Sequence, residues 1–253
     1  MVTFTEAELI AWLSPLFWPF IRVLALFSAL PVLGQRSVPG RVRIGLALLI
    51  VVAAQASMPP MPQVALDSPL AFMLVLQNVL IGLTLGFAVR IVFAAVEFAG
   101  EIIGLQMGLN YAGFFDPTSG AQGTATARFF STTVGLLFIV INGHLLVVAA
   151  VVQSFRAFPV APEPFGFLRA LQPQVWGTEV FALGLWIALP LIGMLLFVNL
   201  VLGVISRVAS QMNVFAIGFP VTLGVGLLGM LLTLPMMQGP FTMALERMLT
   251  HFQ

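Results

Sequence analysis

The chain has 253 residues, of which 60% are hydrophobic and only 8% are charged, and its formal net charge is +1. A soluble domain carries about 25% charged residues, so this composition excludes an ordinary soluble domain and indicates a polytopic membrane protein. The small net charge gives no basis for nucleic-acid binding or for an acidic substrate. The sequence has no cysteine, which excludes disulfide and thiol chemistry.

Apolar segments of about 20 residues, each long enough to cross a hydrocarbon core of about 30 Å, predict an all-α membrane protein. We expect six helices at roughly 9–30, 44–57, 70–110, 129–153, 180–204 and 214–234, and an amphipathic surface helix over 236–253. The second segment is short for a full crossing. The third is about twice a membrane thickness and must kink or leave the bilayer.

The long third segment carries two sets of regularly spaced glycines. Gly100, Gly104 and Gly108 recur every four residues, so on a helix they form a groove that another backbone can approach closely. Gly82 and Gly86 give the same helix a second face of small residues. These five positions are predicted to serve helix packing and assembly.

Charged and polar side chains at membrane depth need partners, because a lone ion there costs a few kcal/mol or more. Glu97 and Glu101 share the glycine side of the third segment, where they either line an ion pathway or pair with arginines of neighbouring chains or of this one. We favour pairing, with Arg90 or Arg128 as partners within the chain. The predicted buried polar or charged partners are Arg22, Arg90, Glu97, Glu101 and Asn213.

A loop must follow the third segment, because Asn110, Gly113 and Asp116-Pro117 disfavour continuation of the helix. The pair Phe114-Phe115 lies inside this loop. It is either ordinary packing or a hydrophobic stopper, and its glycine- and proline-rich surroundings favour the stopper. The predicted plug and gating residues are Gln106, Met107, Asn110, Phe114, Phe115, Asp116 and Pro117.

No catalytic, metal or cofactor motif accompanies these features. The pattern Gly224-x-Gly226-x-x-Gly229 matches a dinucleotide fingerprint but lies in an apolar segment without a preceding strand, so it is interpreted as helix packing. We therefore expect no enzyme, no cofactor and no metal.

Three motifs carry a resemblance to a known family. They are Glu101-x-x-Gly104-x-Gln106-Met107-Gly108-Leu109 followed by Asp116-Pro117, the turn Arg36-Ser37-Val38-Pro39, and Gln211-Met212-Asn213-Val214-Phe215-x-Ile217-Gly218-Phe219-Pro220. Together they resemble the FliR/SctT family of type III export-gate proteins over nearly the whole chain. The chain departs from the family at Ser210, where a proline is common.

The resemblance implies a single export-gate membrane domain over 1–253, built of helical hairpins in a hetero-oligomeric helical ring. Residues 1–128 would be a FliP-like part that includes a plug loop over 106–123, and residues 129–253 would contain a FliQ-like hairpin. The implied partners are FliP and FliQ in the ring, FlhB, FlhA nearby, membrane lipid, and unfolded flagellar proteins in transit. The implied place is the bacterial inner membrane, within the flagellar basal body.

These expectations define one function and two alternatives. The function is a structural and gating subunit of the flagellar protein-export channel. The closer alternative is the counterpart in virulence secretion. The turn Arg36-Ser37-Val38-Pro39 favours the flagellar system over this alternative. The other is a small-solute secondary transporter, for which the sequence shows no clear internal repeat.

Overall fold

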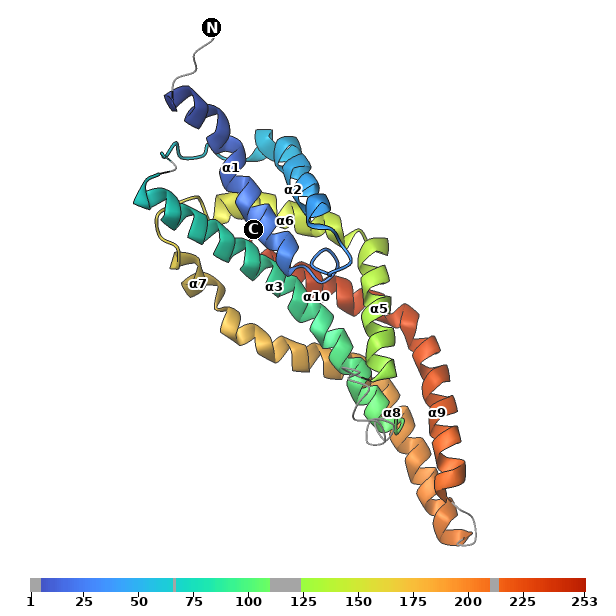
Figure 1. Ribbon diagram of the computed structural model, residues 1–253. Coiled ribbons are helices and arrows are strands. Elements are labelled where there is room, and N and C mark those ends of the chain that lie inside the picture. The colour runs from blue at the N-terminus through green and yellow to red at the C-terminus, as the bar shows by residue number, and fades with distance from the viewer. Residues whose placement is uncertain (1–5, 66, 110–123, 210–213) are drawn as a thin grey trace. The chain divides into compact units, whose positions relative to one another are not determined.

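The structure is a computed structural model that describes residues 6–65, 67–109, 124–209 and 214–253 (Figure 1). All regular elements in these ranges are helical, which confirms the predicted all-α class. In chain order they are α1 (Glu6–Ala29), α2 (Gly40–Ala54), η1 (Gln55–Ser57), α3 (Pro69–Gln106), α5 (Ala125–Val140), α6 (Gly143–Ala157), α7 (Gly166–Leu171), η3 (Pro173–Trp176), α8 (Gly177–Val208), α9 (Val214–Thr233), η4 (Leu234–Met237) and α10 (Gln238–Thr250).

Length and composition identify the membrane segments. Within the described ranges, 5 helical segments are long and apolar enough to cross a membrane, or 6 if α5 and α6 count as one broken span. The protein is therefore a polytopic membrane protein, as its composition predicted. The segment Gly40–Ser57, expected to be short for a crossing, reaches 18 residues because α2 begins directly after Pro39.

One predicted helix is broken. The segment 129–153 was expected to be continuous, but α5 ends at Val140 and α6 begins at Gly143. Asn142 separates them in a left-handed backbone conformation, with φ 58° and ψ 30°. Asparagine tolerates this conformation better than most residues, and Gly143 follows it, so the prediction of a single helix is wrong for a local backbone reason.

The end of α3 also differs from expectation. Gly108 has φ 78°, the N–H of Gly108 donates to the carbonyl of Leu105, and the N–H of Leu109 donates to the carbonyl of Gly104. These two bonds and the left-handed glycine form a Schellman motif, which ends an α-helix. The helix therefore stops at Gln106 and not near residue 110, and Gly108 terminates the glycine series instead of extending its groove.

The C-terminal segment is packed and is not a surface helix. Phe241, Leu245, Leu249 and Phe252 recur at helical spacing and are almost completely buried. Trp176 contacts the ring of Phe252 with centroids 6.0 Å apart. The amphipathic pattern predicted the helix correctly, but its apolar stripe packs on protein.

The chain divides into two compact units, interleaved in sequence. The first contains residues 1–91, 142–176 and 245–253. In it, α1 packs on the N-terminal part of α3 with very close backbone approach, as Figure 1 shows. A β-carbon at Gly82 would collide with the carbonyl oxygen of Arg22, and one at Gly86 would lie 2.5 Å from Cβ of Ala29.

Side chains of α1 and α3 bind the backbone of two proline-rich loops of this unit, one directly after η1 and the other, residues 158–165, directly after α6. Trp18 is fully buried and its indole N–H donates to the carbonyl of Pro62 at 3.0 Å. Gln77 donates to the carbonyl of Pro159 at 3.1 Å and accepts from the N–H of Ala161 at 3.0 Å. These loops thus satisfy part of their backbone hydrogen bonding through α1 and α3.

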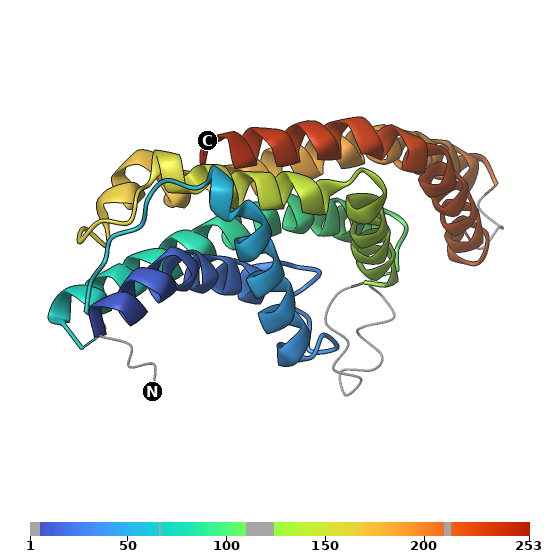
Figure 2. The ribbon, with the colours of Figure 1, turned by 90° about the horizontal axis from the view of Figure 1, so that it is seen from above.

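The second unit contains residues 92–141 and 177–244. Here α8 packs against the C-terminal part of α3: a β-carbon at Gly184 would lie 2.6 Å from the carbonyl oxygen of Ala95, and Phe98 contacts Phe181 edge-to-face at 5.2 Å. Helices α8 and α9 run side by side (Figure 2), and Gly229 of α9 accommodates the end of Met194. The predicted division of the chain at residues 128 and 129 stays a prediction.

Candidate functional site

The candidate site is the pairing of α3 with α5, on either side of residues 110–123. The backbone N–H of Thr124 donates to the Glu101 carboxylate at 3.0 Å. Thr124 is also the N-cap of α5, because its hydroxyl accepts from the N–H of Ala127 at 3.1 Å. Thr124 thus begins α5 and ties its first turn to α3. We call this place, formed by Glu101, Gly104, Met107, Gly108, Thr124 and Thr126, the neck.

Two glycines of α3 allow this close pairing. A β-carbon at Gly100 would lie 2.8 Å from Cα of Ala127, and one at Gly104 would collide with the hydroxyl oxygen of Thr126. Both glycines are buried. The groove predicted at Gly100 and Gly104 therefore exists, but within this chain it is filled by α5 and not by a neighbouring subunit.

The last turn of α3 anchors the other side of the neck. Met107 is completely buried, and its side chain occupies the space where a β-carbon of Gly226 in α9 would lie, at 2.6–2.7 Å. The absence of a side chain at Gly226 thus leaves room for Met107. Gln106, which precedes it, is half-buried.

Several predicted site residues lie outside the described residues. They are Asn110, Phe114, Phe115, Asp116, Pro117 and Asn213. The stopper assignment to Phe114-Phe115 thus remains a prediction from the sequence.

A second carboxylate supports the same helix pair. Glu97 accepts a hydrogen bond from the hydroxyl of Ser131 in α5 at 2.6 Å. Glu97 and Arg90 are exposed on this chain, and Glu101 is half-buried. Among the described residues, neither glutamate forms an ion pair with Arg90 or Arg128; both use α5 instead.

Arg22 is the one fully buried cation in the described part of the chain. Its Nε donates to the side-chain oxygen of Asn78 in α3 at 2.9 Å. Its Nη1 donates to the carbonyl and hydroxyl of Ser154, each at 3.0 Å, and its Nη2 donates to the carbonyl of Phe158 at 3.0 Å. Its guanidinium lies 3.8 Å from the ring centre of Phe155.

These contacts place a positive charge at the C-terminal end of α6, where the last carbonyls carry the negative end of the helix dipole. Arg22 therefore joins α1, α3 and α6 without a carboxylate partner among the described residues. A cation–π contact on Phe155 adds to the hydrogen bonds. The arrangement is structural, because no polar group of this network is left exposed for a substrate.

Sequence reasoning missed the residues that complete these arrangements. Thr124 and Thr126 were not singled out, although a threonine directly before an apolar helical run is a recognisable N-cap signal. Ser154 was missed as a partner of Arg22 because no spacing rule connects residues 132 positions apart.

Comparison with known proteins decides the family. The sequence pattern of the family described as "Bacterial export proteins, family 1" matches residues 13–248, almost the whole chain. This chain belongs to that family. The resemblance to FliR/SctT proteins predicted from three motifs is thereby confirmed.

Several curated members of the bacterial export protein family are similar over most of their length. The flagellar biosynthetic protein FliR of Escherichia coli K12 is 44% identical over 241 residues, covering 95% of this chain and 92% of the relative. FliR of Pectobacterium carotovorum is 41% identical, with 93% and 90% covered. FliR of Bacillus subtilis is 32% identical, with 81% and 80% covered.

Family membership fixes the class of function. A bacterial export protein of this kind is a membrane component of the flagellar export apparatus and not an enzyme. The chemistry of the neck agrees with this class. Its carboxylate is bound to a backbone amide and its other groups are packed, so the arrangement holds α3 and α5 together.

Proposed function

We propose that this protein is a structural and gating subunit of the flagellar type III protein-export channel in the bacterial inner membrane. It assembles with FliP and FliQ in a ring, contacts FlhB, and lies near FlhA. Unfolded flagellar proteins cross the membrane through the conduit that the ring encloses. Residues 106–123 supply a plug that closes this conduit between export events.

The neck is the observation that supports gating. A plug must move, yet it must return to the same place after each substrate has passed. The bond between Glu101 and the N–H of Thr124 holds α3, which precedes residues 110–123, to the start of α5, which follows them. Opening can then occur in the segment between the two ends while α3 and α5 stay paired.

The sequence of that segment suits a stopper. Phe114-Phe115 provides apolar bulk, and Gly113 and Gly120 on either side provide backbone freedom. Only a few kcal/mol should hold such a segment closed, because a larger difference would prevent substrate from displacing it.

The relatives favour the flagellar system over virulence secretion. Relatives from organisms as different as Escherichia coli and Bacillus subtilis carry the name flagellar biosynthetic protein. The turn Arg36-Ser37-Val38-Pro39 points the same way.

Co-expression tests the assembly. The full-length chain, tagged and produced together with FliP and FliQ of the same organism, should purify as one complex in which mass spectrometry identifies all three proteins. Purification of this chain alone, with FliP and FliQ left behind, would contradict the proposed assembly.

A deletion tests the plug. Removal of residues 113–120 should leave the complex assembled but make membrane vesicles permeable to ions or small solutes. Vesicles with an assembled deletion complex that stay as tight as wild type would contradict the plug assignment.

A further inference from the structure

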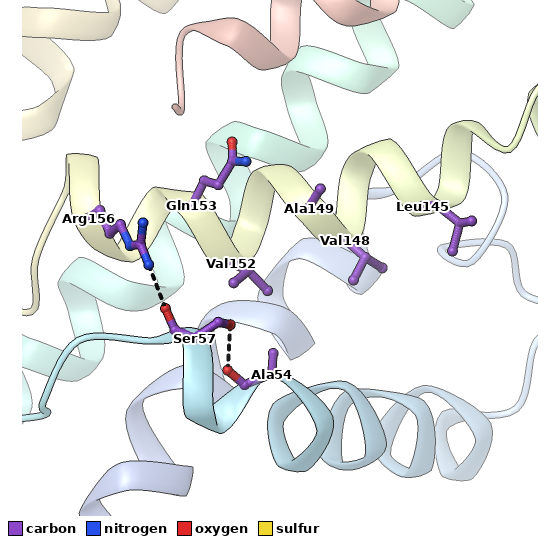
Figure 3. Close-up of a pocket in the computed structure, with 8 residues that line it drawn as sticks. All are labelled: Ala54, Ser57, Leu145, Val148, Ala149, Val152, Gln153 and Arg156. Atoms are coloured by element: carbon purple, nitrogen blue, oxygen red, sulfur yellow. Dashed lines mark hydrogen bonds between the residues drawn. The ribbon is translucent and has the colours of Figure 1, made fainter.

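A groove on the first unit lies between the end of α2 and one side of α6. It encloses about 400 Å³ and is lined mainly by apolar side chains (Figure 3). From α6 it receives Leu145, Val148, Ala149, Val152, Gln153 and Arg156. From α2 and η1 it receives Ala54 and Ser57.

The lining of this groove has helical periodicity. The α6 residues follow the spacing i, i+3, i+4, i+7, i+8, i+11, which forms one continuous stripe along a helix. Ala149 and Ala54 are small, and small residues at an exposed stripe let the backbone of another helix approach closely. The stripe is therefore shaped for a helix running along α6.

Two polar groups at one end restrict what can fill the groove. Gln153 and Arg156 are exposed and lie in successive positions of the stripe. Arg156 donates to the carbonyl of Ser57 at 3.2 Å, and no carboxylate among the described residues pairs with it. A lipid acyl chain would leave Gln153 without a partner and the charge of Arg156 uncompensated in an apolar environment, which is costly, whereas a helix with an acidic side chain can satisfy both groups.

The outer surface of α2 adds to the case for a protein partner. α2 buries Ala47 and Val51, while Leu49 and Val52 are more than half exposed. A helix seated in the groove would contact α2 and α6 together and would extend the buried area of both.

We propose that this groove is a docking site for an apolar α-helix of another membrane subunit, and that this helix carries a carboxylate level with Arg156. The inference rests on the proposed hetero-oligomeric assembly and assigns one interface within it. The carboxylate and the guanidinium form an ion pair at the Ser57 end. The apolar side chains of the incoming helix pack between Leu145 and Val152.

Crosslinking identifies the occupant. A photoreactive phenylalanine analogue at Leu145, in the full-length chain expressed with its native partners, should form an adduct with an apolar helical peptide of another subunit, identified by mass spectrometry. The same analogue at Leu83, an exposed leucine of α3 outside the groove, should not label that peptide. An adduct with lipid, an adduct within this chain, or no adduct from Leu145 would overturn the proposal.

A steric pair tests the fit. Ala149→Leu fills the groove, and Ala53→Leu makes the same change at an exposed position of α2 outside it. We expect the yield of assembled complex to fall about tenfold for Ala149→Leu, a change of roughly 1.4 kcal/mol, and to stay at the wild-type level for Ala53→Leu. Because Ala149 is exposed in the single chain, equal amounts of both variants should reach the membrane. Equal assembly of the two would overturn the proposal.

A charge pair tests the ion pair. Arg156→Glu should reduce assembly, Arg156→Lys should largely preserve it, and the control Arg169→Glu, at another exposed arginine of the same unit, should have no effect. Wild-type assembly by Arg156→Glu would overturn the inference alone. Failure of the wild-type chain to assemble with other subunits would instead contradict the proposed function.

Discussion

The carboxylate of Glu101 binds the backbone N–H of Thr124 at 3.0 Å, across 23 residues of sequence. This bond joins the last turns of α3 to Thr124, the N-cap residue of α5. It therefore holds the start of α5 against the C-terminal part of α3.

Loss of the Glu101 side chain should open the neck. Glu101→Ala leaves the N–H of Thr124 without its partner, and we expect a loss of about 1–3 kcal/mol in the free energy of unfolding. Vesicles that contain the assembled variant should leak small solutes. Glu97→Ala is the control, because Glu97 is exposed and Ser131 can bond to water instead. Equal effects of the two substitutions would show that Glu101 has no special role.

A single methyl group should separate α3 from α5. Gly104→Ala places a β-carbon against the hydroxyl of Thr126, and overpacking of this kind costs about 1–3 kcal/mol. Gly135→Ala in α5 has nothing within 4 Å and should stabilise the helix by about 1 kcal/mol. Thermal unfolding of the two purified variants in the same detergent should shift in opposite directions. A shift of both in the same direction would contradict the packing described at Gly104.

The end of α3 depends on the backbone of Gly108. With φ at 78°, an L-residue there is strained, so Gly108→Ala should lose about 1 kcal/mol of stability, and Gly108→Asn should lose less. Thermal unfolding in detergent measures both. If alanine were tolerated better than asparagine, the left-handed conformation would not be what selects glycine at this position.

Lysine should not replace Arg22. A lysine ammonium cannot reach Asn78, Ser154 and Phe158 together, so Arg22→Lys should destabilise the protein by about 2–4 kcal/mol. The matched change at an exposed arginine, Arg128→Lys, should alter stability by less than about 0.5 kcal/mol. Denaturation of both variants in detergent measures these changes in stability. If Arg22 were needed only for its positive charge, neither variant would lose stability.

The sequence predicted the helices well because apolar length and periodicity carry that information directly. It also predicted that Gly82, Gly86, Gly100 and Gly104 permit close helix approach. It did not identify the helices that would approach them. Periodicity shows which face of a helix carries small residues, but which helix packs on that face depends on contacts between distant parts of the chain. The Gly104 contact with Thr126 is of this kind.

The errors at residues 108 and 142 have a common cause. Both positions adopt a left-handed backbone conformation inside an otherwise helical, apolar stretch. Hydrophobic periodicity continues through such a point, so it predicts one helix where the backbone makes a break. Glycine and asparagine are the residues that signal this outcome, but each also occurs inside membrane helices for packing.

The buried Arg22 network constrains the order in which this protein can be made. A ribosome delivers α1 to the insertion machinery long before residues 154–158 exist, and an unpaired arginine is unfavourable in hydrocarbon. The first helix must then wait in a hydrated or chaperoned environment until α6 has been synthesised. Completion of the Arg22 network therefore waits for α6, the fourth α-helix of the first unit, which couples biogenesis of that unit to the synthesis of α6.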